Sequence, residues 1–266
     1  AALVPTGDSR ALTEAIGSGQ MDLALKLSHA IPATSLPTDA RLLLVAEEIR
    51  RGHPERAAQW LSVGGDTADL SFLAPLITAW TAADRGNADQ AISALDALPS
   101  TSLLAPLVEE ERAFILLKFR RSAEAELPAR RAVGSANARE EKLRIALADA
   151  FLAAGDRQRA LGIIEGMGDG EVAARERIAA GRRNGQAVDN LSKAFSEVMT
   201  AFSADLARLQ RGAPPIGLVQ VARYANPQNS SAVALLALLL AGQDRTEEAL
   251  ALLRAVPQND ALISQI

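Results

Sequence analysis

The chain has 266 residues and a formal net charge of −4 at pH 7, with 48% hydrophobic and only 3% aromatic residues. Such a charge produces no long-range field that would attract phosphate groups, so we expect no nucleic-acid partner. Cysteine is absent, which excludes disulfides and thiolate metal sites but is compatible with either a reducing or an oxidising compartment. Alanine and leucine supply most of the apolar content, which favours an all-α fold.

A turn residue recurs along the chain at a nearly constant spacing of 33 to 35 positions over its first five occurrences. The series is Gly19, Gly52, Gly86, Arg120 and Gly155, followed less regularly by Gly212 and Asp244. Five residues after each comes a small side chain, at Ala24, Ala57, Ala91, Ala125, Ala160, Gly217 and Ala249. A small residue at this place lets two helix axes approach closely, so each unit is predicted to be a helical hairpin.

The segment Leu143–Met167 shows the hairpin pattern most fully. Leu147, Ala148 and Phe151 fall on one helical face, which predicts a buried side for the first helix. Gly155 suits the backbone conformation just past a helix end, and the next residue, Asp156, can cap the second helix.

The pattern breaks after Met167, where three glycines within five residues disfavour a continuous helix. We expect a short helix over 171–181, a surface loop over 182–190, a long helix over 191–210 and a helix over 216–225. Asn190 and Asn229 are predicted helix N-caps. The resulting organisation is repeats over 1–167, an irregular insert over 168–190 and further repeats over 191–266.

The C-terminal residues 259–266 look like the start of another helix, with no polar capping helix after them. A repeat array normally needs such a cap, so we expect either that the natural chain continues or that a second copy covers this end. The first residues look like a trimmed or matured end. The longest apolar run, Ala232–Gly242, is about half the length of a membrane span, so we expect a core helix there.

Three segments, DRGNADQAISAL, AAGDRQRALGII and AGQDRTEEALALL, resemble the tetratricopeptide repeat family, and the resemblance extends over about Ser9–Pro257. It implies an α-solenoid of stacked helix-turn-helix repeats that forms a right-handed superhelix. Pro75 and Glu109 stand where this family usually has an aromatic residue, which leaves a neighbouring helical-repeat family open. The layout also resembles exported bacterial proteins of this family, so both a periplasmic and a cytoplasmic location remain open.

In this family the first helix of each repeat lines a concave groove. Carried over to this sequence, the resemblance implies a partner-binding surface made of Ile49, Leu76, Trp80, Glu110, Phe114, Leu117, Ile145 and Asp149. Trp80 and Phe114 would be its anchors, because buried aromatic side chains dominate many interfaces. The alternative is that these side chains pack against the neighbouring repeat.

Residues with catalytic or metal-binding potential are sparse. His29 and His53 are the only histidines, and neither has a partner at metal-ligand spacing. The triplet Glu109–Glu111 precedes Arg112, which indicates a solvated face. We therefore expect no catalysis, no metal and no cofactor; an enzyme would need a pocket that joins Asp149, Glu110 and an arginine.

The sequence thus predicts a non-catalytic scaffold that binds a protein or peptide in an apolar groove. The alternative is a structural module that self-associates, for example as a homodimer, through its uncapped end.

Overall fold

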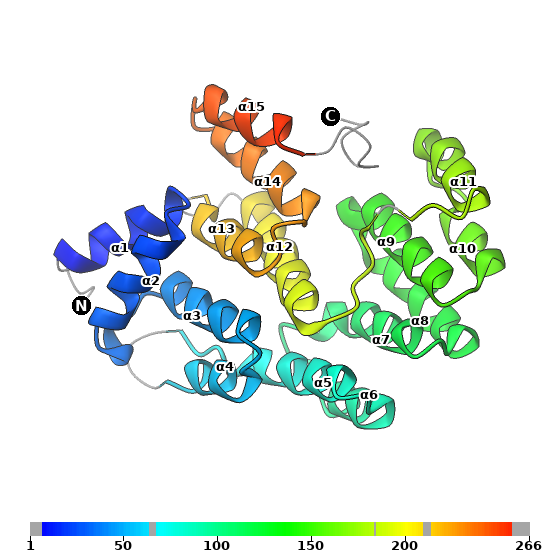
Figure 1. The fold of residues 1–266 in the computed structure, drawn as a ribbon, viewed down its shortest axis with the longest axis horizontal. Helices are drawn as coiled ribbons and strands as arrows, with labels where there is room; N and C mark the ends of the chain where they lie inside the picture. Colours follow the sequence, from blue (N-terminus) through cyan, green and yellow to red (C-terminus); the bar gives the residue numbers. More distant parts are fainter. Residues whose placement is uncertain (1–6, 64–67, 184, 210–213, 257–266) are drawn as a thin grey trace. The chain divides into compact units, whose positions relative to one another are not determined.

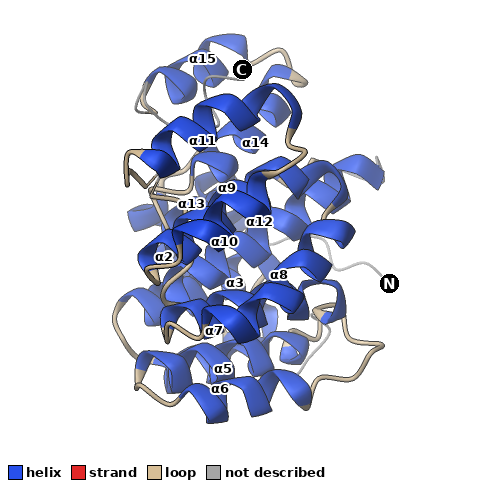
Figure 2. Cartoon of the chain, turned by 90° about the vertical axis from the view of Figure 1, so that its right-hand side faces the viewer, coloured by secondary structure: helices blue, strands red, loops and turns tan. Residues whose placement is uncertain are grey.

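A computed structural model describes residues 7–63, 68–183, 185–209 and 214–256. Within these ranges all regular secondary structure is helical (Figure 2), which confirms the predicted all-α class. The α-helices are α1 (Gly7–Gly17), α2 (Met21–Ala30), α3 (Thr38–Arg50), α4 (Pro54–Leu61), α5 (Ala74–Asp84), α6 (Ala88–Asp96), α7 (Val108–Lys118), α8 (Ser122–Ser135), α9 (Glu140–Ala153), α10 (Arg157–Ile164), α11 (Glu171–Ala179), α12 (Leu191–Leu209), α13 (Ile216–Ala225), α14 (Ser230–Ala241) and α15 (Thr246–Arg254). None of the helices in the described residues combines the length and hydrophobicity of a membrane span.

Helices that follow each other in the chain pack as antiparallel pairs. The pairs α3 with α4, α7 with α8, α9 with α10 and α14 with α15 have the most extensive contacts, and α7 also packs against α9. Figure 1 shows two of these pairs, α7–α8 and α9–α10, as successive hairpins. This is the hairpin stacking of an α-solenoid, as predicted from the repeat spacing. The right-handedness of a superhelix stays a prediction.

The predicted turn residues adopt the left-handed backbone conformation. Their φ angles are +74° at Gly19, +77° at Gly52, +85° at Gly86, +59° at Arg120, +90° at Gly155 and +61° at Asp244. Glycine reaches this region without steric cost, whereas arginine and aspartate adopt it only where the surroundings require it. The turn therefore occurs even where the sequence has lost its glycine. Gly212 and the predicted helix start at 259–266 lie outside the described residues.

The small residues of the second helices lie at the centre of each hairpin. Ala24, Ala57, Ala91, Ala125 and Ala160 are all 0% exposed. Gly217 of α13 faces α3 instead, where a Cβ atom would lie 2.7 Å from Oδ2 of Asp39 and that side chain would have to shift. The column of small side chains therefore sets how closely helices pack, as its spacing predicted.

The chain forms two compact units whose boundaries differ from the predicted blocks. One unit combines Ala1–Ile77 with Phe195–Ala255, and the other contains Thr78–Ala194. In the first unit α13 packs extensively against α3 and also contacts α1, so the later repeats return to the first ones. Repeat spacing reports only contacts between sequence neighbours, which is why it could not reveal this return.

In each unit an arginine of a first helix donates hydrogen bonds to carbonyl oxygens at the end of the second helix of its hairpin. In the first unit Arg41 of α3 is fully buried and donates hydrogen bonds to the carbonyl oxygens of Trp60 (3.1 Å), Leu61 (3.2 Å) and Ala68 (2.9 Å). These groups end or follow α4 and have no partner within that helix. Burial lowers the pKa of Arg41, and the nearby carboxylate of Asp69 opposes this shift.

The same arrangement recurs in the second unit. Arg144 of α9 donates to the carbonyl oxygens of Ile163 (2.7 Å) and Glu165 (2.9 Å) at the end of α10. Arg41 and Arg144 each stand eleven residues before the turn residue of their own hairpin. The two arginines therefore occupy one repeat position, the same one that Pro75 and Glu109 occupy in the intervening repeats and at which the family usually has an aromatic residue.

Replacing Arg41 with methionine should lower the free energy of unfolding by about 3 kcal/mol, because Arg41 is fully buried and three carbonyl groups lose a charged donor. The matched change Arg144→Met should cost only about 1 kcal/mol, since that side chain is partly exposed and water can replace it. Urea unfolding followed by circular dichroism compares the two variants. Equal losses would show that burial of Arg41 does not control its contribution.

Candidate functional site

The eight side chains predicted to line a binding groove are all buried in the folded chain. They are Ile49, Leu76, Trp80, Glu110, Phe114, Leu117, Ile145 and Asp149. Trp80 is 0% exposed, and Phe114, the second predicted anchor, is buried as well. Their role in partner binding stays a prediction, but a partner could touch most of them only after other parts of the chain had moved.

The acidic triplet of α7 is not the solvated face that the sequence suggested. Glu110 and Glu111 are buried, at 5% and 3% exposure. Nε1 of Trp80 donates to Oε2 of Glu111 at 2.6 Å, and Nη1 of Arg139 lies 3.0 Å from Oε2 of Glu110. The reason is that α6, α8 and α9 all pack against α7, so little of its circumference reaches water.

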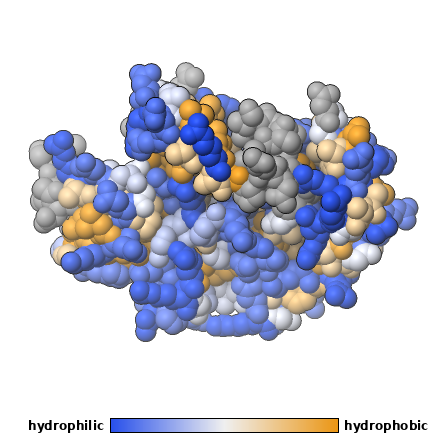
Figure 3. Space-filling view, turned by 45° about the horizontal axis from the view of Figure 1, so that its top comes forward, coloured by the Kyte–Doolittle hydropathy of each residue, from blue (hydrophilic) through white to orange (hydrophobic). Residues whose placement is uncertain are grey.

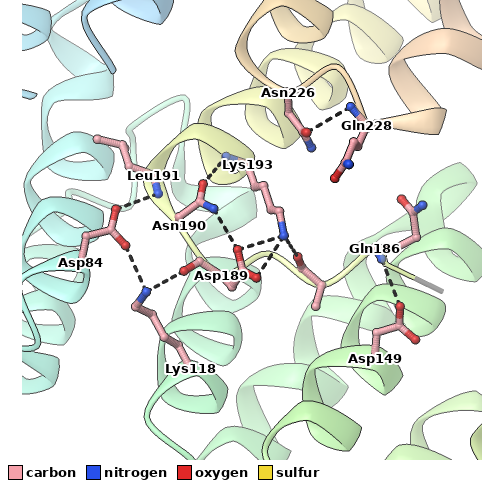
Figure 4. A network of polar contacts seen from close by, with 11 residues as sticks. Asp84, Lys118, Asp149, Gln186, Asp189, Asn190, Leu191, Lys193, Asn226 and Gln228 are labelled. Atoms are coloured by element: carbon pink, nitrogen blue, oxygen red, sulfur yellow. Dashed lines mark hydrogen bonds and ion pairs between the residues drawn. The ribbon is translucent and has the colours of Figure 1, made fainter. Parts of the chain in front are cut away.

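A short segment, Gln186–Leu191, lies against the first helices of three consecutive hairpins in the second unit (Figure 4). It is non-helical as far as Asn190 and ends at Leu191, the first residue of α12. Its first contact is with α9, where Oδ2 of the fully buried Asp149 accepts a hydrogen bond from the backbone N–H of Gln186 at 3.0 Å. A carboxylate held in this way is a strong acceptor for a peptide N–H group. Asp149, one of the predicted groove residues, thus binds this segment directly.

The next two contacts come from α7 and α5. Nζ of Lys118 donates to the backbone carbonyl of Asp189 at 2.6 Å and to Oδ1 of Asp84 at 3.1 Å. Oδ2 of Asp84 accepts from the backbone N–H of Leu191 at 3.1 Å. Lys118 and Asp84 therefore form a charged pair that binds one carbonyl and one N–H group of the same segment (Figure 4).

We call Asp84, Lys118 and Asp149 the polar ladder. Packed helices lie about 8–10 Å apart and five residues span at most about 17 Å, so a segment that touches three successive helices has to be nearly extended. The segment runs in the opposite direction to the order of the repeats, from α9 to α5. The polar ladder therefore recognises main-chain groups at intervals along an extended chain.

The segment also has anchors of its own. Val188 is buried at 4% exposure. Asn190 caps α12 by accepting a hydrogen bond from the backbone N–H of Lys193 at 3.0 Å, and Nζ of Lys193 lies 2.9 Å from Oδ1 of Asp189. The predicted cap at Asn190 is confirmed. The predicted surface loop is correct for Arg182 and Arg183, which are exposed, and wrong for the stretch that contains Val188.

Sequence reasoning missed Asp84, Lys118 and the bound segment. A signal existed, because Asp84 and Lys118 both stand two residues before a turn residue and are one repeat period apart. A charged residue near a helix end is usually exposed to solvent, so this spacing alone does not indicate a binding role for Asp84 and Lys118. Nothing in the sequence indicated that a loop would return across these ends.

The two carboxylates named in the sequence analysis as parts of a possible catalytic pocket contact different groups in the described residues. Glu110 pairs with Arg139, whereas Asp149 binds the backbone of Gln186. Each histidine lies beside a glutamate in the first unit, His29 with Glu47 and His53 with Glu48, both at 3.2 Å. In the described part of the chain no group of three or more candidate ligand side chains could hold a metal ion.

Comparison with protein-family models, with curated proteins and with solved structures finds no significant match to this chain.

The hydrogen bond between Trp80 and Glu111 is a buried polar contact of the second unit whose contribution to stability can be measured. In a double-mutant cycle with Trp80→Phe and Glu111→Gln, we expect a coupling energy of about 1.5–3 kcal/mol, because a buried charged acceptor loses its donor. Thermal or urea unfolding of the four proteins provides the values. Trp60→Phe, at a partly exposed tryptophan of the first unit, is the control and should show no coupling to Glu111→Gln.

Proposed function

We propose that this chain is a non-catalytic scaffold that binds an extended segment of another protein through the polar ladder of its second unit. The observation that carries the proposal is the set of three hydrogen bonds from Asp149, Lys118 and Asp84 to main-chain groups of one segment. Every peptide offers such N–H and carbonyl groups. A site of this kind holds a peptide in one direction and register and tolerates many sequences.

The rigidity of the ladder supports binding over catalysis. Its side chains project from helices in a stacked array, and Asp84 and Lys118 hold each other in place at 3.1 Å. Groups that are already ordered before binding lose little entropy when a partner arrives. The buried apolar side chains of the same helices, among them Phe114 and Ile145, stabilise the packing of this array.

Membership of the tetratricopeptide repeat family is part of the proposal. It is supported by the repeat period, by the left-handed turn residues and by the buried alanines, each of which stands at an equivalent place in successive hairpins.

Selection of random phage-displayed peptides tests the binding function. The targets are the wild-type protein and a Val188→Asp variant, in which the internal segment carries a charge at a buried position. We expect enriched peptides whose affinity falls at least about tenfold, or 1.4 kcal/mol, when Lys118→Met or Asp149→Asn is added, because one charged hydrogen bond is lost. Lys26→Met, an exposed lysine of α2, is the matched control. If neither target enriches any peptide, the proposed function is wrong.

A second candidate function is self-association through the hairpin of α14 and α15. Leu238 of α14 is 69% exposed and Leu250 of α15 is 44% exposed, and Figure 3 shows hydrophobic surface beside hydrophilic surface over this hairpin. Exposed aliphatic side chains on neighbouring helices are a usual feature of interfaces. A homodimer that buried them would cover this end of the array.

Light scattering over a range of protein concentrations tests the second candidate. If α14 and α15 form an interface, the apparent mass should rise with concentration, and Leu238→Lys should abolish the rise because it would bury a charge. Leu103→Lys, at an exposed leucine of the second unit, is the matched control. A mass that stays that of one chain at all concentrations would exclude this function under the conditions used.

A further inference from the structure

We propose that the segment Gln186–Leu191 is an internal ligand that occupies the polar ladder, and that a partner binds by displacing it. The partner would be an extended segment of another protein with an aliphatic side chain at the place of Val188. This inference rests on the proposed function, to which it adds the regulation of the site and the chemistry of the ligand.

The first argument is that another peptide could form the same three hydrogen bonds with the polar ladder. Asp149, Lys118 and Asp84 bind the N–H of Gln186, the carbonyl of Asp189 and the N–H of Leu191. No side chain of the segment takes part in these three bonds. A second peptide in the same register would offer the same groups, so the two chains compete for one set of partners.

The second argument concerns selectivity. Val188 is buried at 4% exposure, whereas Asp189 is exposed; the other buried side chain of the segment, Leu191 at 5%, is the first residue of α12. Burying a valine side chain contributes about 1.5–3 kcal/mol relative to leaving it in water. The position of Val188 is therefore where the site distinguishes one peptide from another, and it accepts an aliphatic residue.

The third argument is that the segment could leave without unfolding its neighbours. Gly181 and Gly185 have φ angles of +68° and +77°, and the residues described between them are exposed. The N-cap of α12 is made by Asn190 itself, through its bond to the N–H of Lys193. Helix α11 and the body of α12 can thus persist while the chain between them moves, and only the cap and the first residue of α12, Asn190 and Leu191, move with it.

Tethering explains why the internal ligand would control access. A segment fixed by both ends has an effective concentration near its site in the millimolar range. A partner peptide at micromolar concentration cannot compete unless it binds much more tightly. The wild-type protein should therefore bind peptides weakly, and any change that releases the segment should strengthen binding.

The experiment uses a synthetic, fluorescently labelled peptide with the sequence of residues 182–193, and measures its binding by fluorescence anisotropy. The proteins are the full wild-type chain, Val188→Asp and the matched control Val172→Asp, which makes the same change at an exposed valine of α11. We expect Val188→Asp to bind the peptide at least tenfold more tightly than the wild type, and Val172→Asp to bind as the wild type does. A peptide that carries aspartate in place of Val188 should not bind.

Hydrogen exchange at the Gln186 amide monitors release of the segment in the same variants. The proposal expects loss of protection in Val188→Asp only. It is overturned if protection persists in that variant, because burial of Val188 is then not what holds the segment. It is also overturned if the segment is released and the affinity for the peptide does not rise.

These results separate the two proposals. If the wild type and Val188→Asp enrich peptides equally from the phage library, the scaffold function stands and the internal ligand does not. If no peptide binds either protein, the scaffold function itself fails.

Discussion

The close approach of two helices at a column of alanines is the constraint on which the rest of this structure depends. Ala57, Ala91, Ala125 and Ala160 are fully buried at the centre of their hairpins, and any larger side chain there would push the helices apart. The left-handed turn residue in front of each second helix aligns the pair. Because the hairpins whose turns are described share this construction, equivalent positions in successive hairpins are placed side by side.

Regular stacking of the hairpins places polar residues from different helices along one stretch of backbone. Asp84 and Lys118 are charged residues near helix ends, and they contact each other because their hairpins are neighbours. Asp149, from a third hairpin, binds the same segment. The three groups then contact one stretch of backbone at intervals. A repeat architecture therefore brings polar residues of successive hairpins onto one stretch of backbone.

Three buried polar side chains have partners that offset the cost of removing them from water. Arg41 binds three carbonyls, Glu111 accepts a hydrogen bond from Trp80, and Asp149 accepts one from the main chain. Such contacts specify one arrangement of the helices, because a shifted helix would leave a charge or carbonyl unpaired. Alanine and leucine packing alone would tolerate several registers.

The sequence by itself determined the local architecture: the all-helical class, the turn residues with their left-handed backbone, the buried alanines and the caps at Asn190, Asp156 and Asn229. These features depend on residues a few positions apart, which is the range over which helical periodicity and capping act. Only the tertiary structure decided that α13 returns to α3, that Glu110 and Glu111 are buried, and that Gln186–Leu191 lies on the polar ladder. These contacts join residues far apart in the chain through main-chain groups or single polar atoms, and such groups leave no periodic pattern in the sequence.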